Sequence, residues 1–273
     1  MGARIQFLWI GFQGMKSRTL IVGYVLALAL FLFGQRHPTS PTFTGFHAVV
    51  DLTHSIDPQA GDRVKTAARV NKEHSLTNPS SAQPFETRID APAHFARGLW
   101  TVDQIPTERL IAPLVVLDVS ANAENHPDYQ ISVEDIAAWE HAHNQIPLGS
   151  VVIARTGWDS NWKSAQRNPA GNPTHFPGYS PDAAKFLVEG RNVLGLGIDA
   201  PNTDSPNIDW PKIDNGRSKD FAARQYTLSH SVYQLENVAN LDRVPAVSAM
   251  VVVAPTKLES GSSGPVRILA LLQ

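Results

Sequence analysis

Phe85-Glu86-Thr87-Arg88-Ile89-Asp90-Ala91-Pro92-Ala93-His94-Phe95 is the stretch around which the rest of this chain is organised. Pro92 fixes its own φ at about −65° and pushes Ala91 toward extended backbone, so the stretch predicts a rigid turn and not a helix interior. The carboxylate of Asp90 and the imidazole of His94 stand on either side of this proline. A rigid turn suits side chains that must be in place before a ligand arrives.

Asp90 and His94 have two interpretations. Their oxygen and nitrogen donors suit a divalent cation such as zinc or manganese, and both side chains can reach one ion. A pair with this spacing also occurs as a surface hydrogen bond that needs no ligand. Spacing alone therefore leaves both the metal site and the hydrogen bond open.

The composition is that of a globular protein and excludes several other classes. The chain has 273 residues, of which 42% are hydrophobic and 18% charged, enough for a large buried core. Its formal net charge of −2 gives no electrostatic footprint for nucleic acid, so we expect no nucleic-acid partner. Because there is no cysteine, disulfides, thiolate nucleophiles and cysteine-ligated zinc are all excluded.

The N-terminal segment, residues 1–44, is predicted to lie outside the fold. Basic residues up to Arg18 precede an apolar run from Leu20 to Phe33, and a linker rich in Pro, Ser and Thr follows. This order is typical of a secretion signal, and the polar flanks disfavour a buried core helix. No small-residue cleavage site ends the run. We therefore expect an uncleaved membrane anchor in preference to a cleaved peptide, with an exported domain at 45–273.

The remaining sequence alternates strand-like segments with helix signals. Continuous apolar runs indicate strands that are buried on both faces. Helices are predicted after the capping residues Ser132 and Ser180. A Gly/Ser turn at 261–264 is predicted to join the last two strands. The strand-like runs are 47–53, 114–119, 151–154, 193–198, 247–253 and 266–272.

Several of these segments together resemble the cyclase or kynurenine-formamidase-like (arylformamidase) family of metal-dependent amidohydrolases. Its signature reads His-x-Gly-Thr-His-x-Asp-x-Pro-x-His-Phe, which this chain matches at Thr87, Asp90, Pro92, His94 and Phe95. The resemblance covers about Val49 to Leu272. Its other matches are Asp51-Leu52-Thr53-His54, Thr156-Gly157-Trp158, Gly197-Ile198-Asp199 with Asp204, and Leu235-Glu236-Asn237.

Four positions depart from the family pattern: Pro84, Glu86 and Arg88 stand where the signature has His, Gly and His, and Arg224 stands where a later His is expected. Arg88 and Arg224 stand where the resemblance implies histidine ligands. Arginine stays protonated and has no lone pair to offer a metal. The ligands that the resemblance leaves for zinc or manganese are Asp90, His94 and Glu236.

The resemblance also indicates candidate catalytic residues. It gives His94 a role in catalysis, and either Asp199 or His54 would help to position the substrate. His54 closes a predicted strand, where a hydrogen-bonded structural role is the other interpretation. His230 would join the metal ligands only if its segment slipped by one helical turn.

The implied fold is an α/β swivelling domain of β/β/α type, with a barrel-like mixed sheet and flanking helices. The implied activity is metal-dependent hydrolysis of small amides or lactams, as in the arylformamidases that release kynurenine from N-formylkynurenine in tryptophan catabolism. The metal would lower the pKa of a bound water to about 7. The expected partners are a small-molecule substrate and further copies of the chain in a homo-oligomer.

The alternative is a non-catalytic relative in which Arg88 and Arg224 replace the metal. Together they carry the charge of a dication, and their guanidinium groups could hold Asp90 and Glu236 in an Arg/Asp/Arg/Glu cluster. Such a pocket would bind an anionic small molecule or a partner. The other possibility is that both arginines turn to solvent.

Overall fold

The central sheet of the domain closes on itself. The computed structural model describes residues 45–55, 86–162, 175–205 and 222–273. Its strands follow the order β1-β10-β2-β8-β7-β5-β3-β9, and β9 pairs again with β10, so all of them except β1 form a closed barrel. The strands are β1 Ala48–Asp51, β2 Arg88–Asp90, β3 Ile111–Asp118, β5 Val151–Arg155, β7 Gly195–Ile198, β8 Tyr233–Glu236, β9 Ala249–Pro255 and β10 Ser263–Leu272.

The barrel mixes parallel and antiparallel pairs. Strands β3, β5, β7 and β8 are parallel neighbours, whereas β2, β9 and β1 pair in antiparallel fashion. Strand β10 has three partners, because its first residues pair with β2 while its later residues lie between β1 and β9. A separate two-stranded sheet joins β4 (Gln130–Ile131) to β6 (Gly178–Tyr179). The predicted barrel-like mixed sheet is confirmed.

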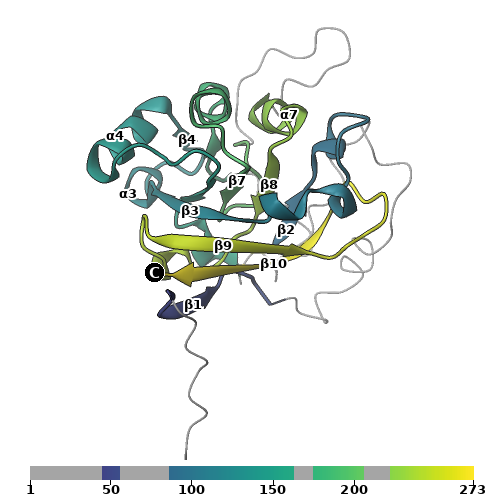
Figure 1. Cartoon of the computed structure of the whole chain (residues 1–273). Coiled ribbons are helices and arrows are strands. Elements are labelled where there is room, and N and C mark those ends of the chain that lie inside the picture. The colour runs from purple at the N-terminus through teal and green to yellow at the C-terminus, as the bar shows by residue number, and fades with distance from the viewer. Residues whose placement is uncertain (1–44, 56–85, 163–174, 206–221) are drawn as a thin grey trace, which may run out of the picture. The chain divides into compact units, whose positions relative to one another are not determined.

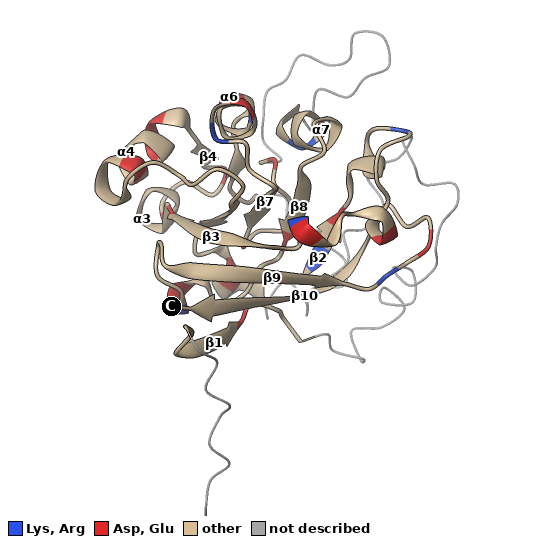
Figure 2. Cartoon of the chain, viewed as in Figure 1, with Lys and Arg blue, Asp and Glu red and all other residues tan. Residues whose placement is uncertain are grey.

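The helices lie on the side of the barrel away from β1 and β10 (Figure 1). They are α3 Ser120–Ala123, α4 Val133–His143, α6 Pro181–Lys185 and α7 Ala222–Ser229. Ser132 caps α4 and Ser180 caps α6, each by accepting a hydrogen bond from the backbone three residues on, as predicted. Acidic positions mark α4 in Figure 2.

Alternation along the strands builds a core on each side of the sheet. Leu114 and Val116 of β3 face the barrel interior, while Val115 and Leu117 face the helices. Strand β5 divides its side chains in the same way. Because both faces are covered, these strands carry unbroken apolar runs, the pattern on which their prediction rested.

Gly195 allows the sheet to close tightly at β7. A Cβ atom on Gly195 would lie 2.4 Å from the ring of Tyr233, which is fully buried on the neighbouring strand. A side chain at this position would therefore displace Tyr233, whose hydroxyl donates to the carbonyl of Arg109. The glycine is needed here for packing.

Two sequence predictions need comment. Strand β10 begins at Ser263, so the predicted turn at 261–264 lies too far along the chain; Gly264 is already paired with Ile89 of β2. The strand extends because β2 offers it a partner. The predicted anchor within residues 1–44 lies outside the described residues, and none of the helices that are described is long and apolar enough to cross a membrane.

Candidate functional site

The short strand β2 sets the site through its register with β8. Arg88 lies opposite Glu236, and Asp90 lies opposite Gln234. Because side chains alternate along a strand, Arg88 and Asp90 share one face with Glu236. Ile89 is fully buried in the core on the other face. Two carboxylates and a guanidinium therefore meet on the helix side of the barrel.

Helix α7 adds a second guanidinium to this face. The carboxylate of Asp204 accepts hydrogen bonds from the backbone N–H groups of Ala223 (2.9 Å) and Arg224 (3.0 Å), so it caps the first turn of α7. Gln234 of β8 donates to the hydroxyl of Thr227, which joins the helix to the strand below it. The Arg224 side chain consequently points at the carboxylates.

The four charged groups form one cluster. Arg224 contacts Asp90 through Nη2 and lies 3.6 Å from Glu236 Oε1 through Nη1. Arg88 lies 3.5 Å from Asp90 Oδ1 and 3.9 Å from Glu236 Oε2. Each carboxylate therefore faces both guanidinium groups. We call this set, Arg88, Asp90, Arg224 and Glu236, the charge cluster.

His94 borders the charge cluster from the turn after β2. Ala91 is extended and residues Pro92–His94 form a 3₁₀ turn, so the rigid turn is confirmed. A hydrogen bond of 3.2 Å joins His94 Nδ1 to Ser262 Oγ. Burial and the Arg88 guanidinium lower the pKa of His94 to about 4, with Glu236 acting in the opposite direction. The imidazole is therefore neutral at pH 7.

The residues present do not fit a divalent metal ion. In the described ranges, no group of three or more His, Asp or Glu side chains is arranged to hold one, whereas a catalytic zinc takes three protein ligands. The carboxylates that would ligate the ion already face Arg88 and Arg224. Guanidinium groups carry no lone pair that could complete the coordination.

Asp199 does not join the charge cluster in any contact between described residues. It follows β7 and accepts hydrogen bonds from the backbone N–H of Thr156 (2.9 Å) and Gly157 (2.8 Å) and from the Thr156 hydroxyl (2.6 Å). Burial raises the pKa of Asp199 to about 7 against the effect of these bonds. Asp199 thus holds the turn after β5, in which Gly157 has a φ of 80°.

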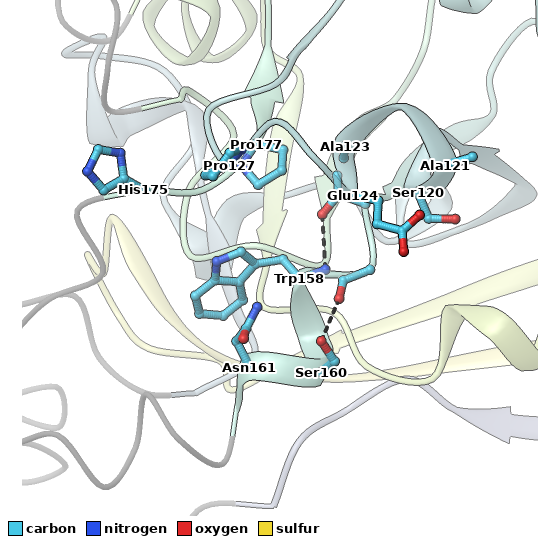
Figure 3. Close-up of a pocket in the computed structure, with 12 residues that line it drawn as sticks. Ser120, Ala121, Ala123, Glu124, Pro127, Trp158, Ser160, Asn161, His175 and Pro177 are labelled. Atoms are coloured by element: carbon cyan, nitrogen blue, oxygen red, sulfur yellow. Dashed lines mark hydrogen bonds between the residues drawn. The ribbon is translucent and has the colours of Figure 1, made fainter.

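That turn forms one wall of a pocket of about 590 Å³. Figure 3 shows the indole of Trp158 beside Asn161, with Pro127 and Pro177 close together on the opposite wall. The hydroxyl of Ser160 donates to the Gly157 carbonyl and closes the turn. The pocket shares no lining residue with the charge cluster, so the two are distinct features of the domain.

His54 and His230 lie outside the charge cluster. His54 stacks on Trp162 with ring centroids 4.0 Å apart, and its backbone N–H donates to the Thr87 hydroxyl. His230 is exposed and directly follows α7, and its Nδ1 bonds to the carbonyl of Tyr226 in that helix. The segment has not slipped by a turn, because Glu236 stands on a strand in register with Arg88. His230 is therefore no replacement ligand.

Sequence reasoning missed two serines that support the site. Arg88 Nη2 donates to the hydroxyl of Ser263, and Ser262 bonds to His94. Ser263 is the first residue of β10 and Ser262 directly precedes it, so both lie far along the chain from β2. No local motif marks them, because only the pairing of Ser263 with Asp90 brings the two segments together.

The fold and these motifs define a hydrolase of the cyclase family, to which the chain belongs: the family model described as putative cyclase matches residues 50–205. The chain is 33% identical to the isatin hydrolase of Roseibium aggregatum over 248 residues, covering 82% of this chain and 91% of that protein. It is 26% identical to the kynurenine formamidase of Salinibacter ruber over 230 residues, covering 81% and 95%.

A solved structure supports the same assignment. Isatin hydrolase A from Labrenzia aggregata, bound to benzyl benzoate, superposes with a TM-score of 0.66 at 27% identity, covering 90% of this chain and 99% of that one. The relatives are thus matched over nearly their whole length. The resemblance inferred from the sequence motifs is confirmed at the level of the family.

Proposed function

We propose that this domain hydrolyses the carbon–nitrogen bond of a small amide or lactam. The observation that carries the proposal is the meeting of buried carboxylates, guanidinium groups and the neutral imidazole of His94 beside β2 and β8. Isatin is a lactam and N-formylkynurenine an amide, and the relatives named for isatin and kynurenine chemistry support this substrate class.

The residues present suit the chemistry of amide hydrolysis. Attack of water on a carbonyl needs a proton acceptor, and the neutral imidazole of His94 offers one. The tetrahedral intermediate needs donors fixed around its oxyanion. Arg88 and Arg224 present N–H groups whose positions the carboxylates hold. Asp90 and Glu236 therefore serve to orient the arginines.

The non-catalytic alternative is less well supported by this geometry. A ligand that carries a full negative charge is attracted by net positive charge, whereas the two guanidinium groups here are balanced by two carboxylates. The net charge of the charge cluster is zero. An anion entering it would meet Asp90 and Glu236 as well as the arginines.

The test is turnover of two substrates by the purified full chain. Isatin and N-formylkynurenine are each incubated with the protein, and the loss of substrate and gain of product are followed by chromatography. We expect one of them to be hydrolysed, and His94→Asn to reduce the rate by about 100-fold or more, the order that general base catalysis contributes. The exposed His141→Asn on α4 is the control. Hydrolysis of neither substrate, with or without added zinc and manganese, would contradict the proposal.

A further inference from the structure

We propose that the guanidinium groups of Arg88 and Arg224 take the electrostatic place of a divalent ion, so that the charge of the site is balanced without metal. The inference concerns what holds the two carboxylates together, and it is independent of which substrate is used. It can therefore hold or fail separately from the proposed hydrolysis. Its evidence is the burial, the charge balance and the geometry of the charge cluster.

Burial makes a charge balance obligatory at this position. Asp90 is 0% exposed and Glu236 is 1% exposed. Two carboxylates in one buried site repel each other, and burying them without a positive charge beside them is costly. The sheet leaves no freedom to separate them, because the Arg88–Glu236 and Asp90–Gln234 pairs are fixed by the β2–β8 register.

The arginines supply this positive charge from two directions. Arg88 comes from the same strand as Asp90, whereas Arg224 comes from the helix above. Each guanidinium reaches both carboxylates. Three of these contacts measure between 3.5 and 3.9 Å, and the contact between Arg224 and Asp90 is closer. Each carboxylate is therefore paired with both positive groups.

A dication added to this arrangement would upset the balance. The charge cluster already sums to zero, so a bound dication would leave two uncompensated positive charges among buried groups. The arginine side chains are only 13% and 7% exposed, so water screens them weakly. Solvent exposure of these arginines, the other possibility raised by the sequence, does not occur in the structure.

The rest of the structure holds the arginines in place. Arg88 donates to Ser263, and the guanidinium carbon of Arg224 lies 5.6 Å from the centroid of the Phe95 ring. The capping of α7 by Asp204 fixes the backbone of Arg224. These contacts preorganise the two cations, as the ligands of a metal site would preorganise an ion.

The test measures metal and compares matched variants. The untagged full chain is purified without added metal, dialysed against zinc or manganese, desalted and analysed by mass spectrometry of its ions. We expect the parent to hold far less than one ion per chain. The double variant Arg88→His, Arg224→His places two imidazoles beside Asp90, Glu236 and His94, and we expect it to retain close to one ion per chain.

The control is Arg191→His, which also removes an ion-paired arginine. Arg191 pairs with Glu140 at 2.6 Å outside the charge cluster, and this variant should bind no more metal than the parent. A double variant that folds but gains no metal would overturn the proposal. If it does not fold, the parent alone decides: its thermal transition should be unchanged by zinc, manganese or chelator.

A parent chain that retains one tightly bound ion, and melts at lower temperature after chelation, would overturn the proposal whatever its activity. Turnover of isatin or N-formylkynurenine is measured on the same samples. Metal-free turnover supports both proposals, whereas a metal-free parent without turnover supports only the charge substitution. The two failures are therefore distinguishable.

Discussion

At the scale of single residues, His54 shows how packing decides the charge of a side chain. Its ring stacks on Trp162 with planes 8° apart, and its Nε2 is buried without a hydrogen-bond partner in the described part of the chain. Burial lowers the pKa of His54 from 6.5 to about 4. The folded protein therefore keeps this imidazole neutral under conditions in which the unfolded chain would protonate it.

We predict that His54 makes the domain less stable in mild acid. Between pH 6.5 and about pH 4 the unfolded chain binds a proton that the folded chain does not, so the stability contributed by neutral His54 is present above pH 6.5 and lost as the pH falls. His54→Phe keeps the stacking and cannot protonate. Urea unfolding is compared at about pH 7 and about pH 4.5. The loss of stability between these two pH values should be smaller in the variant than in the parent.

The control for this experiment is the exposed His141→Phe on α4, which should leave the parent's pH dependence unchanged. Equal losses of stability in the parent and in His54→Phe would show that burial of His54 does not suppress its protonation. A smaller loss of stability in His54→Phe than in the parent would support a structural role for His54.

At the scale of elements, α7 carries the cation that completes the charge cluster. Its first turn is capped by Asp204, which lies in a loop after β7 and not directly before the helix. The cap therefore links two segments of the chain as well as closing the helix. Arg224 is one of the two residues whose N–H groups Asp204 accepts, so a change at the cap acts directly on the cluster.

We predict that Asp204→Ala destabilises the domain by about 0.5–2 kcal/mol, the usual loss on removing a helix N-cap. The measurement is the free energy of unfolding in urea. Asp182→Ala removes an exposed acidic residue from the first turn of α6 and serves as the control, with an expected change within about 0.5 kcal/mol. A loss no larger than that of the control would mean that Asp204 does not hold α7.

The elements that the sequence predicts well are those whose signals are local. Runs such as 151–154 are strands because both of their faces are apolar, and Ser132 marks a helix start within three residues. Strand β2 is only three residues long and carries two charges, so its strand character comes from its partners. The cap of α7 likewise depends on a residue from a distant segment.

The same distinction applies to the candidate site. The motif places Asp90 and His94 on one rigid turn, as the structure does. The motifs also identify Arg88 and Arg224 as replacements of two expected histidines, and the structure gathers both arginines around the carboxylates. The roles of Ser262 and Ser263 could not be predicted, since they depend on the register of β10. The role of Asp199 in positioning the substrate stays a prediction, and its hydrogen bonds hold the Thr156–Gly157 turn.

At the scale of the whole molecule, the barrel is complete within residues 45–273. Its first strand begins at Ala48 and its last ends at Leu272. Every strand of the closed sheet finds its partners within these limits. Nothing in the described pairing of strands therefore requires residues 1–44.

We predict that a chain lacking residues 1–44 remains soluble and folded. The reason is that the hydrogen bonds and both cores of the described domain lie after residue 44. The measurement is thermal unfolding followed by circular dichroism, together with size-exclusion chromatography. Aggregation, or loss of a cooperative transition, would show that the N-terminal segment packs into the domain.

The three-way pairing of β10 has a consequence for biosynthesis. Val50 near the start of the domain pairs with Ala270, and Asp90 pairs with Ser263. Strands β1 and β2 therefore cannot form these pairs until β10 has been translated. Contacts of such long sequence separation make folding slow, because the intervening chain must be closed into a loop first. A premature stop codon before position 263 would remove β10 and leave one edge of each of β1, β2 and β9 open to aggregation.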